Sequence, residues 1–487
     1  MSGRLVGLHS ATGVALIAAT VLASGAASLD ANVVKVAVPA IGHDLRAGVG
    51  ALQWTLTSYL LVVAALLLLS GALADQFARR RLLVVGLCVM LLSSVLCAVA
   101  PSIGTLIAAR ALEGVGAALV VPNSLALLNG TLDPSDRAIG IGIWAGLETL
   151  TTTVGPYAAG WLADNVSWRA VFLLTIPLVI GALIVIRRVP ENRVKWTGAS
   201  PDLLGGLLAV VGLGCVIYAL TSGPESGWLG PRVLITAVVG CVALGSLIPL
   251  ERRTRAPMLR MSVFGSRQFD AINLTTLLLY GALGTASYIV ILQCEVRLGY
   301  SASKAGAALI PESVVFLLIT PISGALEARL GPRWLMTSGI VIVAGAFVCL
   351  SAAQPGLSYW AAILPGALLW GLGTGLAVSP LTAAVLAAVD DADLGEVSGI
   401  NDAASRLGGV VVLALVPVFI GATSGRSLAK ALVHGYQPAM LVMGAICVGA
   451  ALITALFVSN ERVTDPSLAR LPPRRFGTEV AERRRQA

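Results

Sequence analysis

The sequence predicts an all-α protein that crosses a membrane about fourteen times. Its 487 residues are 57% hydrophobic and only 12% charged, whereas a soluble domain carries about 25% charged residues. The apolar residues come in blocks of about 20, the length that an α-helix needs to cross roughly 30 Å of hydrocarbon. These two observations exclude a water-soluble fold and make the blocks membrane spans.

The spans fall into three groups. The first six are expected near residues 11–38, 51–74, 82–100, 103–128, 138–163 and 168–187. Two more follow near 203–222 and 231–250, and the last six lie near 269–294, 303–326, 333–352, 359–389, 396–421 and 437–458. The chain is therefore expected to form a six-helix bundle (1–190), two extra transmembrane helices with cytoplasmic linkers (191–262), a second six-helix bundle (263–460) and a basic cytoplasmic tail (461–487).

Most lysines and arginines of the short loops fall on one side of these spans. They include Arg4, the run from Arg79 to Arg81, Arg137 and the arginine-rich tail. Because cytoplasmic loops carry the excess of basic residues, both termini are expected in the cytoplasm. The net charge of +8 then needs no nucleic-acid partner, since basic loops and a basic tail lie next to anionic lipid.

Cysteine and histidine give no sign of a metal or catalytic site. The seven cysteines lie in apolar stretches without metal-ligand spacing, and the three histidines are far apart. No cofactor and no enzyme activity are expected. A membrane-embedded enzyme or receptor would need a catalytic constellation or an extramembrane domain, and the sequence contains neither.

A weakly repeated motif indicates that the chain has two related halves. Gly71 to Asp75, followed by Arg79, recurs weakly as Gly324 to Glu327, followed by Arg329. Each copy lies between the second and third helices of its bundle. Repeated halves with a substrate site between them are typical of secondary transporters.

Several motifs then occur in a fixed order along the chain. They are Leu29-Asp30 with Val36 to Pro39, Gln53-Trp54, Ser58-Tyr59-Leu60, Gly71 with Asp75, Arg79 and Arg80, Arg110 with Glu113 to Gly116, Gly146 with Gly155-Pro156 and Gly160, Trp168 to Phe172, and Ser398 to Asn401 before Gly408-Gly409. Singly each motif is weak, but in this order they resemble the fourteen-helix drug:proton antiporter family of the major facilitator superfamily. The resemblance implies two six-helix bundles plus two additional helices, and a monomer in the bacterial cytoplasmic membrane.

Acidic side chains inside the spans are the candidate coupling residues. An ionised side chain at the membrane centre costs about 2.5–3.5 kcal/mol or more, so each acid should face the bundle interior. Desolvation favours the neutral form of a carboxyl group, which suits a reversible proton carrier. Asp30 is the first candidate, and its alternative is a permanently paired structural acid, with Lys35 as one candidate partner. Five residues of helix place these two about 140° apart, so direct pairing would need irregular backbone.

The other intramembrane charges have open alternatives. Arg110 and Glu113 can pair on one helix face, although the resemblance places the arginine in the proton pathway. Glu148 is expected to serve coupling or substrate contact, and Glu312 is left open between site and structure. Asp402 and Arg406, four residues apart, favour an internal pair.

Two further sets complete the expected site. The glycines Gly146, Gly155 and Gly160 let helices approach closely, and Pro156 bends its helix. Gly71, Asp75, Arg79 and Arg80 are either ordinary loop charges or, by the resemblance, a latch that stabilises the outward-facing state. Six aromatic residues are candidates for a pocket, with membrane-interface positions or packing as the alternative: Trp54, Trp144, Tyr157, Tyr280, Tyr288 and Trp370.

The sequence thus predicts proton-driven export of amphipathic or hydrophobic small molecules such as drugs, with antibiotic resistance as its consequence. The expected partners are a small-molecule substrate, protons and the lipid bilayer. An exporter dedicated to an endogenous metabolite or lipid is the alternative, and the sequence does not separate the two.

Overall fold

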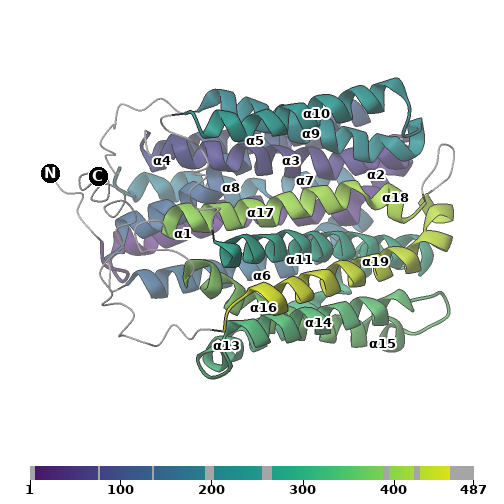
Figure 1. Ribbon diagram of the computed structural model, residues 1–487. Coiled ribbons are helices and arrows are strands. Elements are labelled where there is room, and N and C mark those ends of the chain that lie inside the picture. Colours follow the sequence, from purple (N-terminus) through teal and green to yellow (C-terminus); the bar gives the residue numbers. More distant parts are fainter. Residues whose placement is uncertain are drawn as a thin grey trace, which may run out of the picture.

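The computed structural model describes residues 6–74, 77–133, 136–191, 202–254, 266–387, 394–421 and 428–460. These residues form long helices that run roughly side by side (Figure 1). Within these ranges the chain has no β-strand, and one isolated bridge joins Val6 to Leu132. The expectation of an all-α fold is confirmed.

The first half contains six helical segments, of which the first and sixth are interrupted. They are α1 (Ala11–Val33) with the 3₁₀ turn η1 (Val34–Ala37) and α2 (Val38–Asp44), α3 (Val49–Ala74), α4 (Arg79–Ala98), α5 (Ile103–Thr131), α6 (Arg137–Asn165), and α7 (Trp168–Leu173) with α8 (Ile176–Val185) and the 3₁₀ turn η2 (Ile186–Arg188). Pro39 stands in the first turn of α2, where the missing N–H is tolerated. The 3₁₀ turn η1 interrupts the regular α-helix of the first segment between α1 and α2.

Two helices, α9 (Leu203–Ser226) and α10 (Pro231–Glu251), follow the first half. They pack against each other, and α9 also packs on α3, α17 and α18. The Trp54 ring of α3 lies 6.2 Å from the Tyr218 ring of α9, measured between centroids. In Figure 1 this pair lies along one edge of the bundle.

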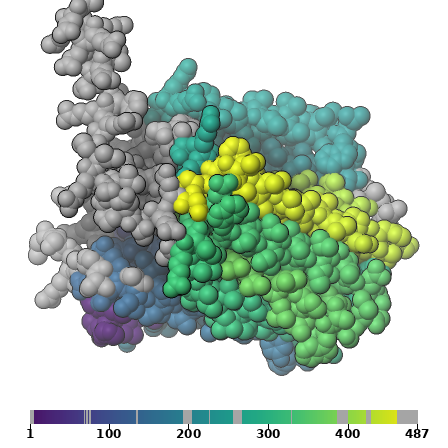
Figure 2. All heavy atoms as spheres, turned by 60° about the horizontal axis from the view of Figure 1, so that its bottom comes forward, coloured from purple at the N-terminus to yellow at the C-terminus, as the bar shows by residue number. Residues whose placement is uncertain are grey.

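The second half contains six further segments. They are α11 (Arg267–Leu292) with the π-turn η3 (Gln293–Arg297), α12 (Ala302–Ala307) with α13 (Ile310–Leu330), α14 (Pro332–Ser351), α15 (Tyr359–Ala362) with α16 (Leu364–Ala387), α17 (Leu394–Ala414) with α18 (Val416–Phe419), and α19 (Leu428–Phe457). Figure 2 shows α19 (yellow) running across the face of this half, next to the green helices that precede it.

Twelve of the helical segments in the described ranges are long and apolar enough to cross a membrane. The long helices α6 and α17 are outside that set. Both carry charged residues at mid-length, Glu148 in α6 and the pair Asp402 and Arg406 in α17. These charged residues are tolerated because α6 packs along α12 and α17 packs along α3, each a helix of the other half. One face of α6 and one face of α17 therefore meet protein and not lipid.

Close glycine contacts hold helices together within each half. On α5, a β-carbon added to Gly116 would lie 2.6 Å from the Met90 side chain and 2.8 Å from the Gly86 carbonyl oxygen of α4. Small residues permit this approach of two backbones, which is the usual basis of helix packing in membranes.

Gly116→Ala should therefore destabilise the protein by about 1–3 kcal/mol, because the added methyl overpacks the α4–α5 contact. Gly104→Ala, on the same helix, is the matched control, since its β-carbon would meet no atom within 4 Å and alanine favours helix by up to about 1 kcal/mol. The melting temperatures of the detergent-purified variants check this. Equal melting temperatures would show that the contact is not tight.

Candidate functional site

A buried charge cluster joins three side chains of the first half. Arg110 of α5 donates through Nη1 to Oδ2 of Asp30 on α1 at 2.5 Å and to Oε2 of Glu113 at 2.7 Å. The side chains are 1%, 0% and 0% exposed, respectively. The structure therefore brings together three of the predicted coupling residues.

The cluster is held from several sides. The Arg110 Nε–H donates to the Thr55 carbonyl at 3.1 Å, and the guanidinium carbon lies 4.4 Å from the centroid of the Tyr59 ring. Ser94 donates its hydroxyl to Glu113 Oε1 at 2.6 Å. Such contacts fix the guanidinium orientation and lower the cost of burying it.

The two acids of the cluster differ in how their oxygens are satisfied. Both oxygens of Glu113 have partners, since Ser94 donates to Oε1 and Arg110 donates to Oε2. Cys97 Sγ also lies 3.5 Å from Oε2. Oδ1 of Asp30 has no hydrogen-bond partner among the described residues. One cation thus faces two carboxyl groups, and an added proton on one of them would make the cluster neutral.

Asp30 and Lys35 do not pair. Asp30 binds Arg110, while the Lys35 ammonium donates to Asn32 Oδ1 at 3.1 Å. The angular separation along the helix keeps the two side chains apart even though η1 interrupts the regular pitch. Lys35 is therefore not the partner of Asp30 in this structure, and Arg110 is.

A second polar group lies near the boundary of the two halves. Glu148 of α6 accepts a hydrogen bond from the Ser28 hydroxyl of α1. Its electrostatic neighbours are Arg406 and Asp402 of α17. Arg406 donates to Asp402 at 3.2 Å, four residues away, which is the internal pair that the spacing favours.

A central cavity of about 380 Å³ lies between the halves. Helices α1, α6, α11, α13 and α16 contribute to it, and its lining includes these predicted site residues: Lys35, Pro156, Tyr280, Glu312 and Trp370. The Trp370 ring is fixed by an edge-on contact with Phe347, with 4.9 Å between centroids. No described residue of α9 or α10 is among the lining residues.

The other aromatic candidates lie elsewhere. Trp54 packs on Tyr218, and Trp144 lies against the core of the first half. Tyr288 is 2% exposed within the main core, whereas Tyr157 is 45% exposed on the surface of α6. Each of these four is outside the central cavity.

The halves meet closely at one end of the cavity, where α6 packs on α12. Gly160 lies against the backbone of Ala302, and Gly306 lies against the backbone of Pro156. Asp164 of α6 accepts the backbone N–H of Ala302 at 3.0 Å and that of Ser303 at 2.9 Å, together with the Ser303 hydroxyl. We call these contacts the α6–α12 closure.

The remaining glycines of α6 have different surroundings. Gly155 lies against the Leu29 side chain of α1, whereas a β-carbon on Gly146 would meet no atom within 4 Å. At the opposite end of the molecule, Arg79 donates to the Ala126 carbonyl at 2.8 Å, and Arg80 has no partner among the described residues. Gly71 lies in the last turn of α3, and Asp75 is outside the described residues.

The sequence decides the family of this arrangement. The profile of the Major Facilitator Superfamily matches residues 20–413 and 272–484. The chain belongs to the major facilitator superfamily. The predicted superfamily is thereby confirmed, and the protein is a multi-pass membrane protein of a transporter superfamily.

Relatives within the superfamily span most of the chain. The methylenomycin A resistance protein of Bacillus subtilis is 31% identical over 474 residues, which cover 96% of this chain and 99% of that protein. The multidrug resistance protein Stp of Mycobacterium tuberculosis is 31% identical, covering 82% and 74%. The cephamycin export protein CmcT of Amycolatopsis lactamdurans is 30% identical, covering 91% and 92%.

A solved transporter structure has the same fold. The POT family transporter PepTSo superposes with a TM-score of 0.65 at 16% identity, and the match covers 91% of this chain and 97% of that one. At this identity the likeness extends to the fold alone.

Two acids of the site were not identified from the sequence. Glu295 belongs to η3, beyond the expected span end at 294, and its buried Oε1 has no hydrogen-bond partner in the described part of the chain. Asp164 is the electrostatic neighbour of Glu295. The signal for Asp164 was its position just before the Trp168 motif, while a π-turn gives no clear signal in sequence.

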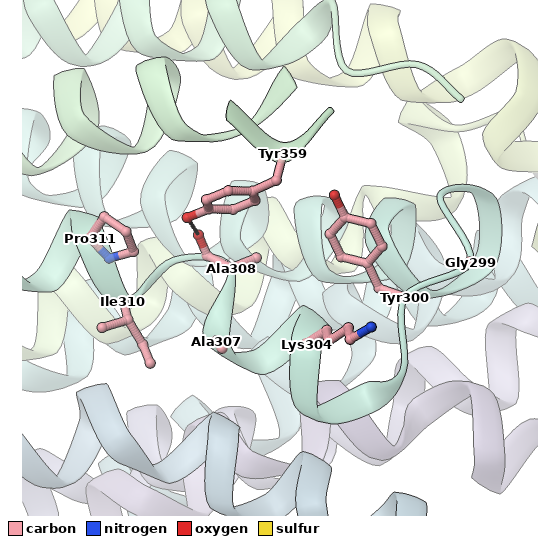
Figure 3. A pocket seen from close by; sticks show the side chains of 8 residues that line it. All are labelled: Gly299, Tyr300, Lys304, Ala307, Ala308, Ile310, Pro311 and Tyr359. Atoms are coloured by element: carbon pink, nitrogen blue, oxygen red, sulfur yellow. Dashed lines mark hydrogen bonds between the residues drawn. The ribbon is translucent and has the colours of Figure 1, made fainter. Parts of the chain in front are cut away.

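A further hollow of about 590 Å³ lies in the second half, beside α12 and α15. Figure 3 shows that Tyr300, Lys304 and Tyr359 surround it, with the Tyr359 hydroxyl donating to the Ala308 carbonyl at 3.1 Å. It is separate from the central cavity, although Ile310 lines both.

Proposed function

We propose that this chain exports amphipathic or hydrophobic small molecules, drugs among them, in exchange for protons by alternating access. The single observation that carries the coupling is the buried cluster in which Arg110 faces both Asp30 and Glu113. Two acids that share one cation can take up and release one proton without leaving a large buried charge. Two relatives are named for resistance, to methylenomycin A and to multiple drugs, and a third is named for the export of cephamycin. These names support drugs as the class of substrate.

The proposed architecture has fourteen spans, namely two six-helix bundles and two additional helices. Helices α6 and α17 add to the twelve apolar spans, because they run alongside spans of the other half. The boundaries at 190, 262 and 460 follow from this count, with α9 and α10 as the inserted pair. The protein acts as a monomer in the bacterial cytoplasmic membrane, with both termini in the cytoplasm.

In this alternating-access mechanism, each remaining site residue has a proposed role. The α6–α12 closure lies at the end away from the basic loop of Arg79 to Arg81, so it closes the outer side and leaves the cavity open to the cytoplasm. Asp30, Arg110 and Glu113 bind the proton, while Glu148, Lys35 and Glu312 contact substrate or assist the proton. Gly155, Pro156 and Gly160 provide the moving contact.

One observation favours the alternative of a dedicated metabolite exporter. The relative CmcT, which matches over nearly its whole length, is named for the export of one compound. An endogenous product is thus a second candidate substrate, with the same mechanism.

The experiment uses the purified protein in proteoliposomes loaded with a fluorescent amphiphile, N-phenyl-1-naphthylamine, and with a small panel of antibiotics of different charge. An imposed pH gradient should drive movement of at least one compound, and an uncoupler should stop it. Liposomes without protein are the control. Movement that the uncoupler leaves unchanged would contradict proton coupling.

A further inference from the structure

Lys35 is the cation of the central cavity. It belongs to η1, the 3₁₀ turn that interrupts the first span, and it is 7% exposed. It lines the cavity together with side chains of the second half, including Glu312 and Trp370. Lys35 is thus a nearly buried ammonium at the boundary of the two halves.

The Lys35 ammonium has no counter-ion within the residues that the structure describes. An ammonium has three N–H donors, and one of them is used by Asn32 Oδ1 at 3.1 Å. Among the described residues no carboxylate comes within ion-pair distance of it. Asp30 is bound to Arg110, and Glu312 Oε2 accepts from the Ser313 hydroxyl at 3.0 Å. A buried charge without a partner is costly, so a bound anion would lower the free energy of this site.

The threonines of the cavity offer few further donors. The hydroxyls of Thr149, Thr152 and Thr153 donate to backbone carbonyls of their own helix at 2.8–2.9 Å. Asn32 likewise donates to the Ser28 carbonyl at 2.9 Å. The Lys35 ammonium is the one cationic donor among the described residues that line the cavity.

Apolar side chains make up a large part of the remaining lining. Tyr280, Leu283, Phe316 and Trp370 present aromatic and aliphatic surface to a space of about 380 Å³. A volume of this size accommodates a small organic molecule. The shape and chemistry suit a ligand with an apolar, ring-containing body.

We infer that the cavity selects small molecules that combine such an apolar body with one anionic group, and that Lys35 binds this group. The inference rests on the proposed function, because it names the substrate class of the same cavity. A charge-assisted hydrogen bond in a desolvated site would give the anion about tenfold or greater preference over an uncharged analogue.

The test compares two probes with the same ring system. 1-Anilinonaphthalene-8-sulfonate carries a sulfonate that N-phenyl-1-naphthylamine lacks. Binding of each probe is titrated calorimetrically on the full chain in lipid nanodiscs, with empty nanodiscs as the blank and without any pH gradient. The variants are Lys35→Met, Lys35→Arg and Lys304→Met, the last removing a lysine beside the other hollow (Figure 3).

The wild type should bind the sulfonate at least about tenfold more tightly than the amine. Lys35→Met should remove this preference and leave amine binding within about twofold, while Lys35→Arg and Lys304→Met should keep it. If Lys35→Met does not fold, as judged by its melting temperature, Lys35→Gln replaces it.

Three results would overturn the inference. They are a wild type without preference for the sulfonate, an equal loss of both probes in Lys35→Met, and a loss of preference in Lys304→Met. Failure of the proposed function is seen separately, since uncoupler-insensitive transport would leave the ratio of the two affinities unchanged.

Discussion

Asp30→Asn should reduce proton-driven transport to the level of protein-free liposomes while the protein remains folded. In the wild type, Arg110 balances one of two acids, and the second acid can exchange a proton. The asparagine leaves Arg110 paired with Glu113 alone, which is neutral without any proton to exchange. The cluster would then have no reason to bind or release a proton as the protein changes conformation.

The fold should tolerate this change. Asparagine has the shape of aspartate and still accepts a hydrogen bond from Arg110, and it removes the carboxylate oxygen that has no partner. Arg110→Met is a poorer test, because it leaves two buried carboxyl groups without their cation and costs about 3–5 kcal/mol of stability.

The measurement is the rate of pH-gradient-driven transport in proteoliposomes at matched protein amounts. Asp44→Asn is the matched control, since Asp44 ends the same span and pairs with Arg169 at 2.6 Å on the surface. An exposed pair contributes only about 0–1 kcal/mol, so this control should transport normally. Equal rates for Asp30→Asn and wild type would remove Asp30 from the mechanism and point to Glu148.

The sequence predicted the burial of Asp30 but not its partner. Insertion cost alone requires that an intramembrane acid face the protein interior, and the structure agrees. Arg110 lies 80 positions away on another helix, so no local spacing rule connects the two residues. The Arg110–Glu113 pair, three residues apart, was within reach of helix geometry and is present.

The aromatic candidates show a second limit. Hydropathy finds a span but does not say which side of it faces the other half. Tyr280 and Trp370 line the cavity, whereas Trp54 contacts α9, the helix that follows the first half in the sequence. Glu295 was missed for a third reason, because α11 continues through a π-turn beyond the end that the apolar pattern indicates.

Substitutions in the α6–α12 closure should also have a large effect on transport. Gly306→Leu should abolish transport, because the new side chain would occupy the space of the Pro156 backbone and prevent the two halves from meeting. Gly160→Leu should act in the same way against Ala302. Backbone atoms of packed helices cannot move aside as a flexible side chain can, so the outer end would remain open.

Gly142→Leu is the matched control, since Gly142 lies on α6 and a β-carbon there would meet no atom within 4 Å. Transport is measured as for Asp30→Asn. The opening is measured as the distance between spin labels at Asn165 and Ser301, two exposed positions beside the closure, in a chain whose exposed Cys88 and Cys241 are replaced by serine.

Gly306→Leu should lengthen the label distance and leave transport at background, whereas Gly142→Leu should change neither. The two readouts separate a local packing defect from a gate. If the distance lengthens and transport continues at the wild-type rate, the closure is not a required step of the cycle. If the distance stays short and transport is lost, the leucine acts by some route other than holding the halves apart. Only the joint change supports a cycle in which α6 and α12 must meet and separate at each turnover.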